Sequence, residues 1–152
     1  MSEKNNNNDT SNRELSITRL LNAPRELVWK VWTEAKHIAK WWGPEGFTNT
    51  IHTMEVKPGG VWNFIMHGPD GTDYKNKSIY LEIVKPEKII FEHVSPKFKA
   101  IATFTEQGNK TLLTWRMIFE SAEELENVVK VFKADIGLKQ NVDKLEKYLS
   151  GM

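Results

Sequence analysis

The sequence predicts an α+β protein in which a curved antiparallel sheet of about seven strands wraps around one long C-terminal helix. Six short runs rich in β-branched and aromatic residues occupy positions 46–119. A helical pattern fills positions 121–149, and one strand with short helices precedes the sheet. A chain of 152 residues has the size of one domain, which we place at 13–150.

The chain begins with a polar, asparagine-rich segment, MSEKNNNNDTSN, and we expect a disordered tail over residues 1–12. The segment RELSITRLLNAP then alternates polar and apolar residues, which predicts a strand that ends near Asn22. Pro24 suits the first turn of a helix. One or two short helices are predicted after it, from the helical spacing of Leu27, Val28, Val31 and Trp32.

Turn sequences divide the middle of the chain into strands. KPGG, GPDG, VKPEK, VSPK and EQGN are typical of turns, and their glycines do not have the spacing of a phosphate-binding loop. Short strands separated by such turns predict an antiparallel meander. The predicted strands are 46–57, 60–67, 74–84, 88–94, 97–106 and 110–119.

A capping box predicts where the long helix begins, with Ser121 as N-cap and Glu124 three residues later. The apolar stripe of this helix changes direction at Gly137. A bend at Gly137, different neighbours at the two ends, or a straight helix with a wide buried face would each explain the change. The two stripes are Leu125, Val128, Val129, Phe132 and Ile136, then Leu138, Val142, Leu145 and Leu149.

Alternation along the strands predicts which side chains face inward. The large apolar residues of four strands fall on one face, and a sheet with such a face needs a cover, which the C-terminal helix provides. In strand 74–84 the face of Tyr80 and Glu82 and the face of Leu81 and Ile83 both remain possible, and a bulge would reconcile them. The predicted inner set is Trp62, Phe64, Met66, Ile89, Phe91, Phe98, Ala100, Ala102, Phe104, Leu113, Trp115, Met117 and Phe119.

Composition excludes several classes of function. With 21 Lys and Arg against 20 Asp and Glu, the charge is balanced, so we expect no nucleic-acid partner. The absence of cysteine rules out disulfides, thiol nucleophiles and thiolate metal sites. The four histidines lack paired-ligand spacing, so no metal or cofactor is expected. No segment approaches the roughly 20 apolar residues of a membrane span and no signal peptide is seen, so we expect a cytoplasmic protein.

Several segments together resemble one family. WWGP, VKPGGVW, MHGPDGTDY, YLEIVKPEKIIFEH and IGLKQNVDKLEKYL, in this order, resemble the START-like (SRPBCC) superfamily, over residues 13–150. Within it the chain is similar to the branch homologous to the activator of the ninety-kilodalton heat-shock protein ATPase. The resemblance implies a helix-grip fold whose sheet and long helix enclose a deep, largely apolar cavity. Leu138 and Val142 differ from the residues frequent in the family, but not in polarity.

The resemblance and the inward-facing pattern together indicate which residues line such a cavity. These side chains are equally typical of an ordinary core. Surface or edge positions are the simpler expectation for the histidines, but the strand parity of His52 and of His93 also allows either to reach the cavity. Glu82 is a weak catalytic candidate, because desolvation would raise its pKa if it faced the cavity, whereas on the outer face it is simply solvated. The expected lining is Trp41, Trp42, Trp62, Phe64, Met66, Tyr80, Phe91, Trp115, Met117, Phe132 and Ile136.

The adjacent Trp41 and Trp42 cannot point the same way, because neighbouring side chains diverge on helices and strands. We expect Trp42 to pack inward and Trp41 to lie across the cavity entrance. The alternative is that both rings anchor the short helices to the core.

The residue pattern and the family resemblance lead to three hypotheses about function. The first is binding of a small, largely apolar or lipid-like ligand, and we favour it. The second, implied by the family resemblance, is interaction with a heat-shock chaperone. The third is a cyclase-like or dehydratase-like enzyme that uses the same cavity. No pair of residues has diagnostic catalytic spacing, so the chain is not expected to be an enzyme.

Overall fold

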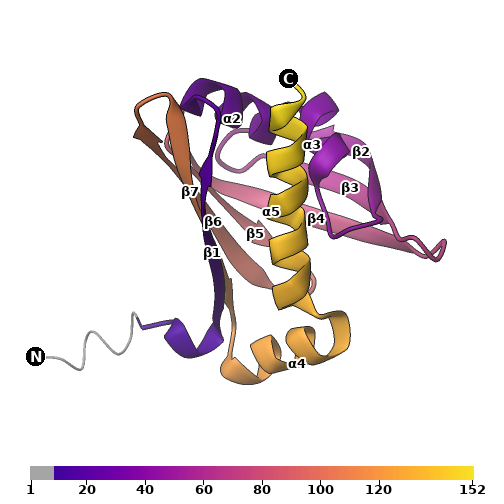
Figure 1. Ribbon diagram of the computed structural model, residues 1–152. Coiled ribbons are helices and arrows are strands. Elements are labelled where there is room, and N and C mark those ends of the chain that lie inside the picture. The colour runs from indigo at the N-terminus through magenta and orange to yellow at the C-terminus, as the bar shows by residue number, and fades with distance from the viewer. Residues whose placement is uncertain (1–8) are drawn as a thin grey trace, which may run out of the picture.

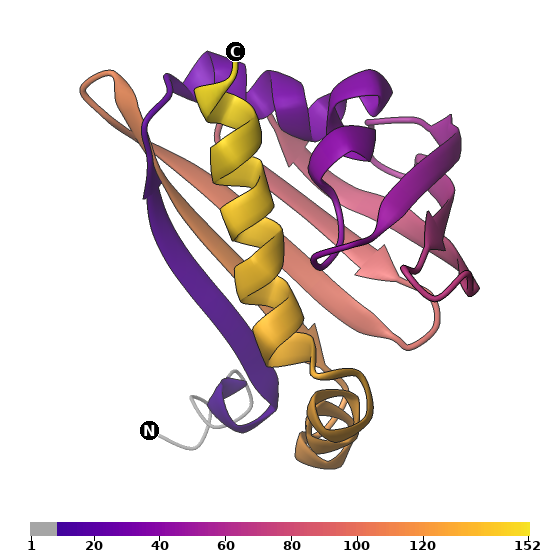
Figure 2. The same cartoon turned by 45° about the vertical axis from the view of Figure 1, so that its right-hand side comes forward.

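The computed structural model describes residues 9–152, and predictions for residues 1–8 lie outside the described residues. Seven antiparallel strands form one sheet in the order β1-β7-β6-β5-β4-β3-β2, and α5 crosses one face of it (Figures 1 and 2). The predicted α+β helix-grip fold is confirmed. The strands are β1 (Glu14–Leu21), β2 (Thr48–Met54), β3 (Val61–His67), β4 (Asp73–Val84), β5 (Lys88–His93), β6 (Phe98–Gln107) and β7 (Lys110–Phe119).

The helices cover one side of this sheet. Two short helices follow β1 as predicted, and they lie beside the C-terminal end of α5, while α4 lies at the opposite end of α5 (Figure 1). Within residues 9–12 of the predicted tail the structure contains the start of a short 3-10 helix, η1. There Thr10 donates a 2.6 Å hydrogen bond to Glu14. The helices are η1 (Ser11–Arg13), α2 (Arg25–Thr33), α3 (Ala35–Trp41), α4 (Ala122–Phe132) and α5 (Ala134–Ser150).

The prediction of one continuous C-terminal helix is wrong, because the chain breaks at Lys133. This residue has φ of 52° and ψ of 47°, the left-handed conformation, which ends α4 and redirects the chain into α5. The break lies four residues before Gly137, where the apolar pattern changes. Gly137 has another role: a Cβ at this position would lie 3.3 Å from Cγ of Pro44, so the glycine permits a close approach of the loop after α3.

The two apolar stripes of this region have different fates. The α5 stripe of Leu138, Val142, Leu145 and Leu149 is buried as predicted, whereas in the earlier stripe only Val128 is buried. Phe132 and Ile136 are 63% and 51% exposed. The capping box is confirmed at its N-cap, where Ser121 Oγ accepts a 3.1 Å hydrogen bond from the backbone N–H of Glu124.

Strand β4 contains a bulge that reconciles its two predicted faces. Tyr80 pairs with Phe91 and Glu82 with the next residue of β5, so Leu81 is the extra residue. Before the bulge Tyr80 points inward and is buried. After it, Glu82 points outward and its carboxylate lies 3.1 Å from Lys88 Nζ.

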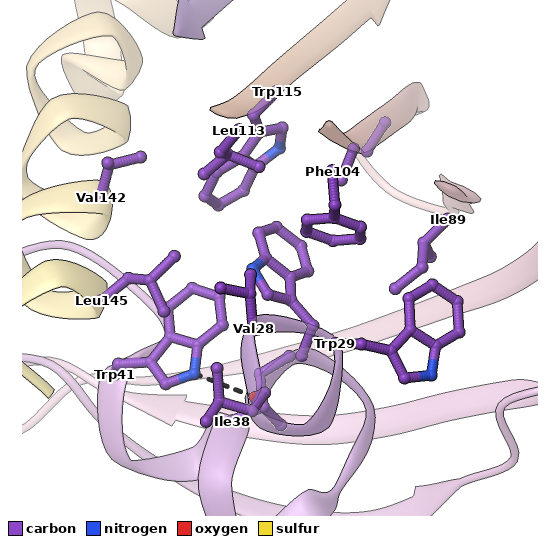
Figure 3. Close-up of a cluster of buried hydrophobic side chains, with 14 of the residues drawn as sticks. Val28, Trp29, Ile38, Trp41, Ile89, Phe104, Leu113, Trp115, Val142 and Leu145 are labelled. Atoms are coloured by element: carbon purple, nitrogen blue, oxygen red, sulfur yellow. Dashed lines mark hydrogen bonds between the residues drawn. The ribbon is translucent and has the colours of Figure 1, made fainter. Parts of the chain in front are cut away.

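A tightly packed core fills the space between the sheet and the α2–α3 end of α5. Figure 3 shows Val142 and Leu145 of α5 facing this cluster. The buried indole of Trp41 donates a 3.1 Å hydrogen bond to the carbonyl oxygen of Val31, and the ring of Trp32 lies 5.0 Å from that of Trp41. The other members that Figure 3 labels are Val28, Trp29, Ile38, Ile89, Phe104, Leu113 and Trp115.

The left-handed residue between α4 and α5 predicts an unusual response to substitution. Lys133→Val should lower the free energy of unfolding by about 1–2 kcal/mol, because a β-branched side chain clashes with the backbone at positive φ. Lys133→Gly should not lower it, since glycine accepts this conformation. Urea denaturation measures both. Lys130→Val, at an exposed position inside α4, is the matched control and should cost less than about 0.7 kcal/mol. Equal losses at positions 130 and 133 would contradict the strain.

Candidate functional site

A pocket lies between the sheet and the helices at the end where α4 and α5 meet. Its volume is about 770 Å³, within the range of roughly 300–1,000 Å³ typical of small-molecule sites. The inner faces of β3 to β7 form one wall, and the loop after α3, α4 and the first half of α5 form the other. The apolar side chains of the lining include Trp42, Pro44, Phe47, Trp62, Phe64, Met66, Phe91, Phe98, Trp115, Met117, Phe119, Val128, Val131, Phe132, Ile136 and Leu138.

The structure brings together nine of the eleven residues expected from the sequence. The two exceptions are Trp41, which belongs to the packed core, and Tyr80, which lies behind Trp62 with its ring 6.2 Å away. Burial raises the pKa of the Tyr80 hydroxyl, so it remains protonated at neutral pH. The nine are Trp42, Trp62, Phe64, Met66, Phe91, Trp115, Met117, Phe132 and Ile136.

Sequence reasoning missed several lining residues. Phe98 and Phe119 belong to the predicted inner face but not to the predicted site, although the same alternation places them beside Met117. Ser78 shares the face of Tyr80 and was available from the same pattern. The loop after α3 and Asn141 also line the pocket, but no sequence pattern predicts this, because it depends on how that loop meets α5.

The two adjacent tryptophans have separate roles. Trp42 faces the pocket, stacks on Trp115 at a centroid distance of 5.2 Å and meets Trp62 edge-on at 4.8 Å. The expectation that Trp42 packs inward therefore holds. Trp41 does not lie across the entrance: it is fully buried, and its N–H donates to the Val31 carbonyl oxygen of α2.

Hydrogen bonds from α5 hold the loop after α3 at the pocket edge. Asn141 Nδ2 donates to the carbonyl oxygen of Trp41 at 2.8 Å, and Gln140 Oε1 accepts from the Glu45 N–H at 3.1 Å. Lys144 Nζ lies 3.2 Å and 3.1 Å from the carbonyl oxygens of residues 44 and 47. Partial burial lowers the pKa of Lys144. These contacts fix one rim of the pocket relative to the helix.

His93 is the histidine that reaches the pocket, and it is buried there. Its Nδ1 lies 2.8 Å from the Pro96 carbonyl oxygen and its Nε2 2.7 Å from Asn76 Oδ1. Two acceptors would suit an imidazolium, but desolvation outweighs the Pro96 hydrogen bond and lowers the pKa of His93. A neutral ring has a single N–H and donates to one of these two oxygens, while the Asn76 amide N–H donates to the Tyr74 carbonyl oxygen at 3.0 Å.

The remaining titratable candidates lie outside the pocket. Glu82 faces solvent beside Lys88 and His52 is exposed on β2, so neither reaches the lining. Hydrogen bonds of 2.7 Å join His67 to Asp73 and to Thr50 on the same outer region of the sheet. This trio also lies away from the pocket. Of Glu82 and the histidines, His93 is the one that lines the pocket among residues 9–152.

The described residues contain neither a cluster of metal ligands nor a helix suited to cross a membrane. Among residues 9–152 no three His, Asp or Glu side chains are grouped in a way that would hold a metal ion. None of the helices described here has the length and apolar character needed to cross a bilayer.

The seven-stranded sheet, the helix across it and the pocket at one end define a helix-grip protein. The family described as "Activator of Hsp90 ATPase homolog 1-like protein" matches residues 22–150, and this chain belongs to that family. No curated protein is similar enough to be matched with the chain.

Solved structures share this fold. A protein from Arthrobacter aurescens has a TM-score of 0.88 at 24% identity, with 95% of this chain and 90% of that chain covered. A Nitrosomonas europaea protein has a TM-score of 0.84 at 20% identity, with 93% of this chain and 96% of that chain covered. A Mycobacterium smegmatis protein has a TM-score of 0.83 at 24% identity, with 94% of each chain covered. At these identities the likeness concerns the fold alone.

The buried imidazole predicts a pH dependence of stability. The pKa of His93 is lower in the folded than in the unfolded chain, so the unfolded chain binds more protons below about pH 6.5. The contribution of His93 to stability is therefore complete above this pH and is lost as the pH falls below it. His93→Gln should reduce the fall in unfolding free energy between pH 7.5 and 5.5, measured by urea titration.

His52→Gln is the matched control, because this imidazole is exposed on the sheet. It should leave the pH profile of the wild type unchanged. A profile that His93→Gln does not alter would contradict the assignment of a buried neutral ring.

Proposed function

We propose that this protein binds a small, largely apolar molecule in the pocket between the sheet and the helices α4 and α5. The observation that carries the proposal is a pocket of about 770 Å³ whose lining is mainly aromatic and aliphatic. Small-molecule sites have this size and this character, with a few polar groups that orient the ligand.

The break in the C-terminal helix supports the proposal. Because the chain turns at Lys133, Phe132 and Ile136 are directed to the pocket edge and are not buried against the sheet. Covering such side chains with an apolar ligand removes their surface from water, at about 25 cal/mol per Å². If Phe132 and Ile136 filled the pocket themselves, they would be buried, but both are exposed.

The rigidity of the opposite wall also supports binding. Trp42 and Trp115 are stacked, and Trp62 stacks on Phe64 at 4.5 Å, so this wall consists of aromatic rings that hold one another in place. A preformed wall costs little conformational entropy when a ligand binds. A chaperone partner, by comparison, has only the family description in its favour.

Titration with N-phenyl-1-naphthylamine, a neutral probe whose fluorescence rises in apolar surroundings, tests the proposal. The wild type should bind one probe per chain. Met117→Trp adds a ring at an inward position of β7 that lines the pocket, and it should weaken binding by about tenfold or more, the equivalent of losing about 1.5 kcal/mol of apolar contact.

Ile118→Trp is the matched control, since it places the same ring on the outer face of the same strand, and it should bind like the wild type. Phe132→Ala provides a second variant at an exposed site, where folding is not at risk, and should also weaken binding. Failure of the wild type to bind, or equal binding by the Met117 and Ile118 variants, would refute the proposal.

A further inference from the structure

Three polar atoms of residues that line the pocket are buried and have no hydrogen-bond partner among residues 9–152. They are Ser78 Oγ, Trp62 Nε1 and Trp115 Nε1. An indole N–H can only donate, and a serine hydroxyl can donate once and rotate to do so. Buried polar groups are nearly always paired in folded proteins, because an unpaired one retains the full penalty of desolvation.

Ser78 occupies the centre of a row that crosses the sheet. It pairs with Trp62 of β3 on one side and with His93 of β5 on the other, and all three are buried on the inner face. The residue itself is 1% exposed, so its hydroxyl is shielded from bulk water and from the pocket alike. A turn about χ1 would direct this unpaired hydroxyl to an acceptor that arrives with the contents of the pocket.

The polar neighbours in the lining do not provide that acceptor. His93 lies within hydrogen-bonding distance of Asn76 Oδ1 and of the Pro96 carbonyl oxygen, and Asn76 Nδ2 donates to the Tyr74 carbonyl oxygen. Asn141 uses its amide N–H on the Trp41 carbonyl. The unpaired buried side-chain atoms of the lining are thus two indole N–H groups and one hydroxyl, and all three belong to strands of the sheet.

The charge distribution restricts what the acceptor is. The charged residues of the lining are Glu45, Lys75 and Lys133, and each is exposed to solvent. No cation stands in the row of Trp62, Ser78 and His93, where burial keeps the imidazole neutral. A carboxylate placed there would lose its hydration without gaining a counter-ion, so a neutral oxygen fits better than an anionic one.

We propose that the ligand is a flat apolar molecule with a neutral carbonyl-type oxygen, and that Ser78 donates a hydrogen bond to this oxygen. The inference rests on the proposed function, because it specifies the ligand class of the same pocket. The rings of Trp62 and Trp115, the second of which is labelled in Figure 3, select a planar ring system by stacking or edge contact. Their N–H groups are buried in the same wall and have no hydrogen-bond partner among residues 9–152.

Three naphthalenes with one substituent at the same position test this assignment: 2-acetylnaphthalene, 2-ethylnaphthalene and 2-naphthoate. Their affinities are measured by displacement of N-phenyl-1-naphthylamine. Ser78→Ala should weaken the ketone by about two- to tenfold, the range for one neutral hydrogen bond, and leave the ethyl compound within about twofold. The carboxylate should bind more weakly than the ketone to the wild type.

Ser95→Ala is the matched control, because Ser95 also lines the pocket but is exposed, and it should change neither affinity. Ser78→Ala should keep or raise the melting temperature, since it removes an unpaired buried hydroxyl, so a lost affinity would not reflect unfolding. If the naphthalenes bind but Ser78→Ala affects ketone and hydrocarbon alike, this inference is overturned and the proposed function stands. If none binds the wild type, both fall.

Discussion

The stacking of Trp42 on Trp115 determines where the packed core ends and the pocket begins. On one side of this pair lies the cluster of Trp32, Trp41 and Phe104, with ring centroids 5.0 Å and 5.5 Å from that of Trp32. On the other side lies the pocket. Each aromatic contact of this kind contributes about 0.5–1.5 kcal/mol beyond area burial, and Trp32 meets both members of the pair. Several aromatic contacts therefore hold the dividing wall in place.

Beyond this wall the core side chains do not fill the space over the sheet. Whether that space stays open depends on the C-terminal helices. α5 buries its stripe from Leu138 to Leu149 against the sheet and the short helices, but the turn at Lys133 directs α4 away from the axis of α5 (Figure 2). Hydrogen bonds from Asn141 to the end of α3 and from Lys144 to the loop after it tie this rim to α5 and oppose its collapse into the space. A pocket is the result.

Much of this arrangement is predictable from the sequence, for a physical reason. A strand has a period of two residues, so a sheet with one packed face shows its inward residues directly, and the faces of β3, β6 and β7 follow from it. The bulge at Leu81 shifts this period and leaves both faces of β4 plausible until the pairing with β5 is known. The break at Lys133 has no glycine or proline to mark it, because a lysine there adopts the conformation that glycine usually takes. The roles of Trp41 and Trp42 depend on the exit angle of α3, which side-chain type does not encode.

The most direct test of the account is a crystal structure of the protein grown with 2-bromonaphthalene, with the bromine located by its anomalous scattering. The account predicts one bromine site on the pocket side of Trp42, between the sheet and the junction of α4 and α5, with the Trp42–Trp115 pair in place. A structure in which Phe132 and Ile136 fill that space and no bromine lies beside Trp42 would contradict it.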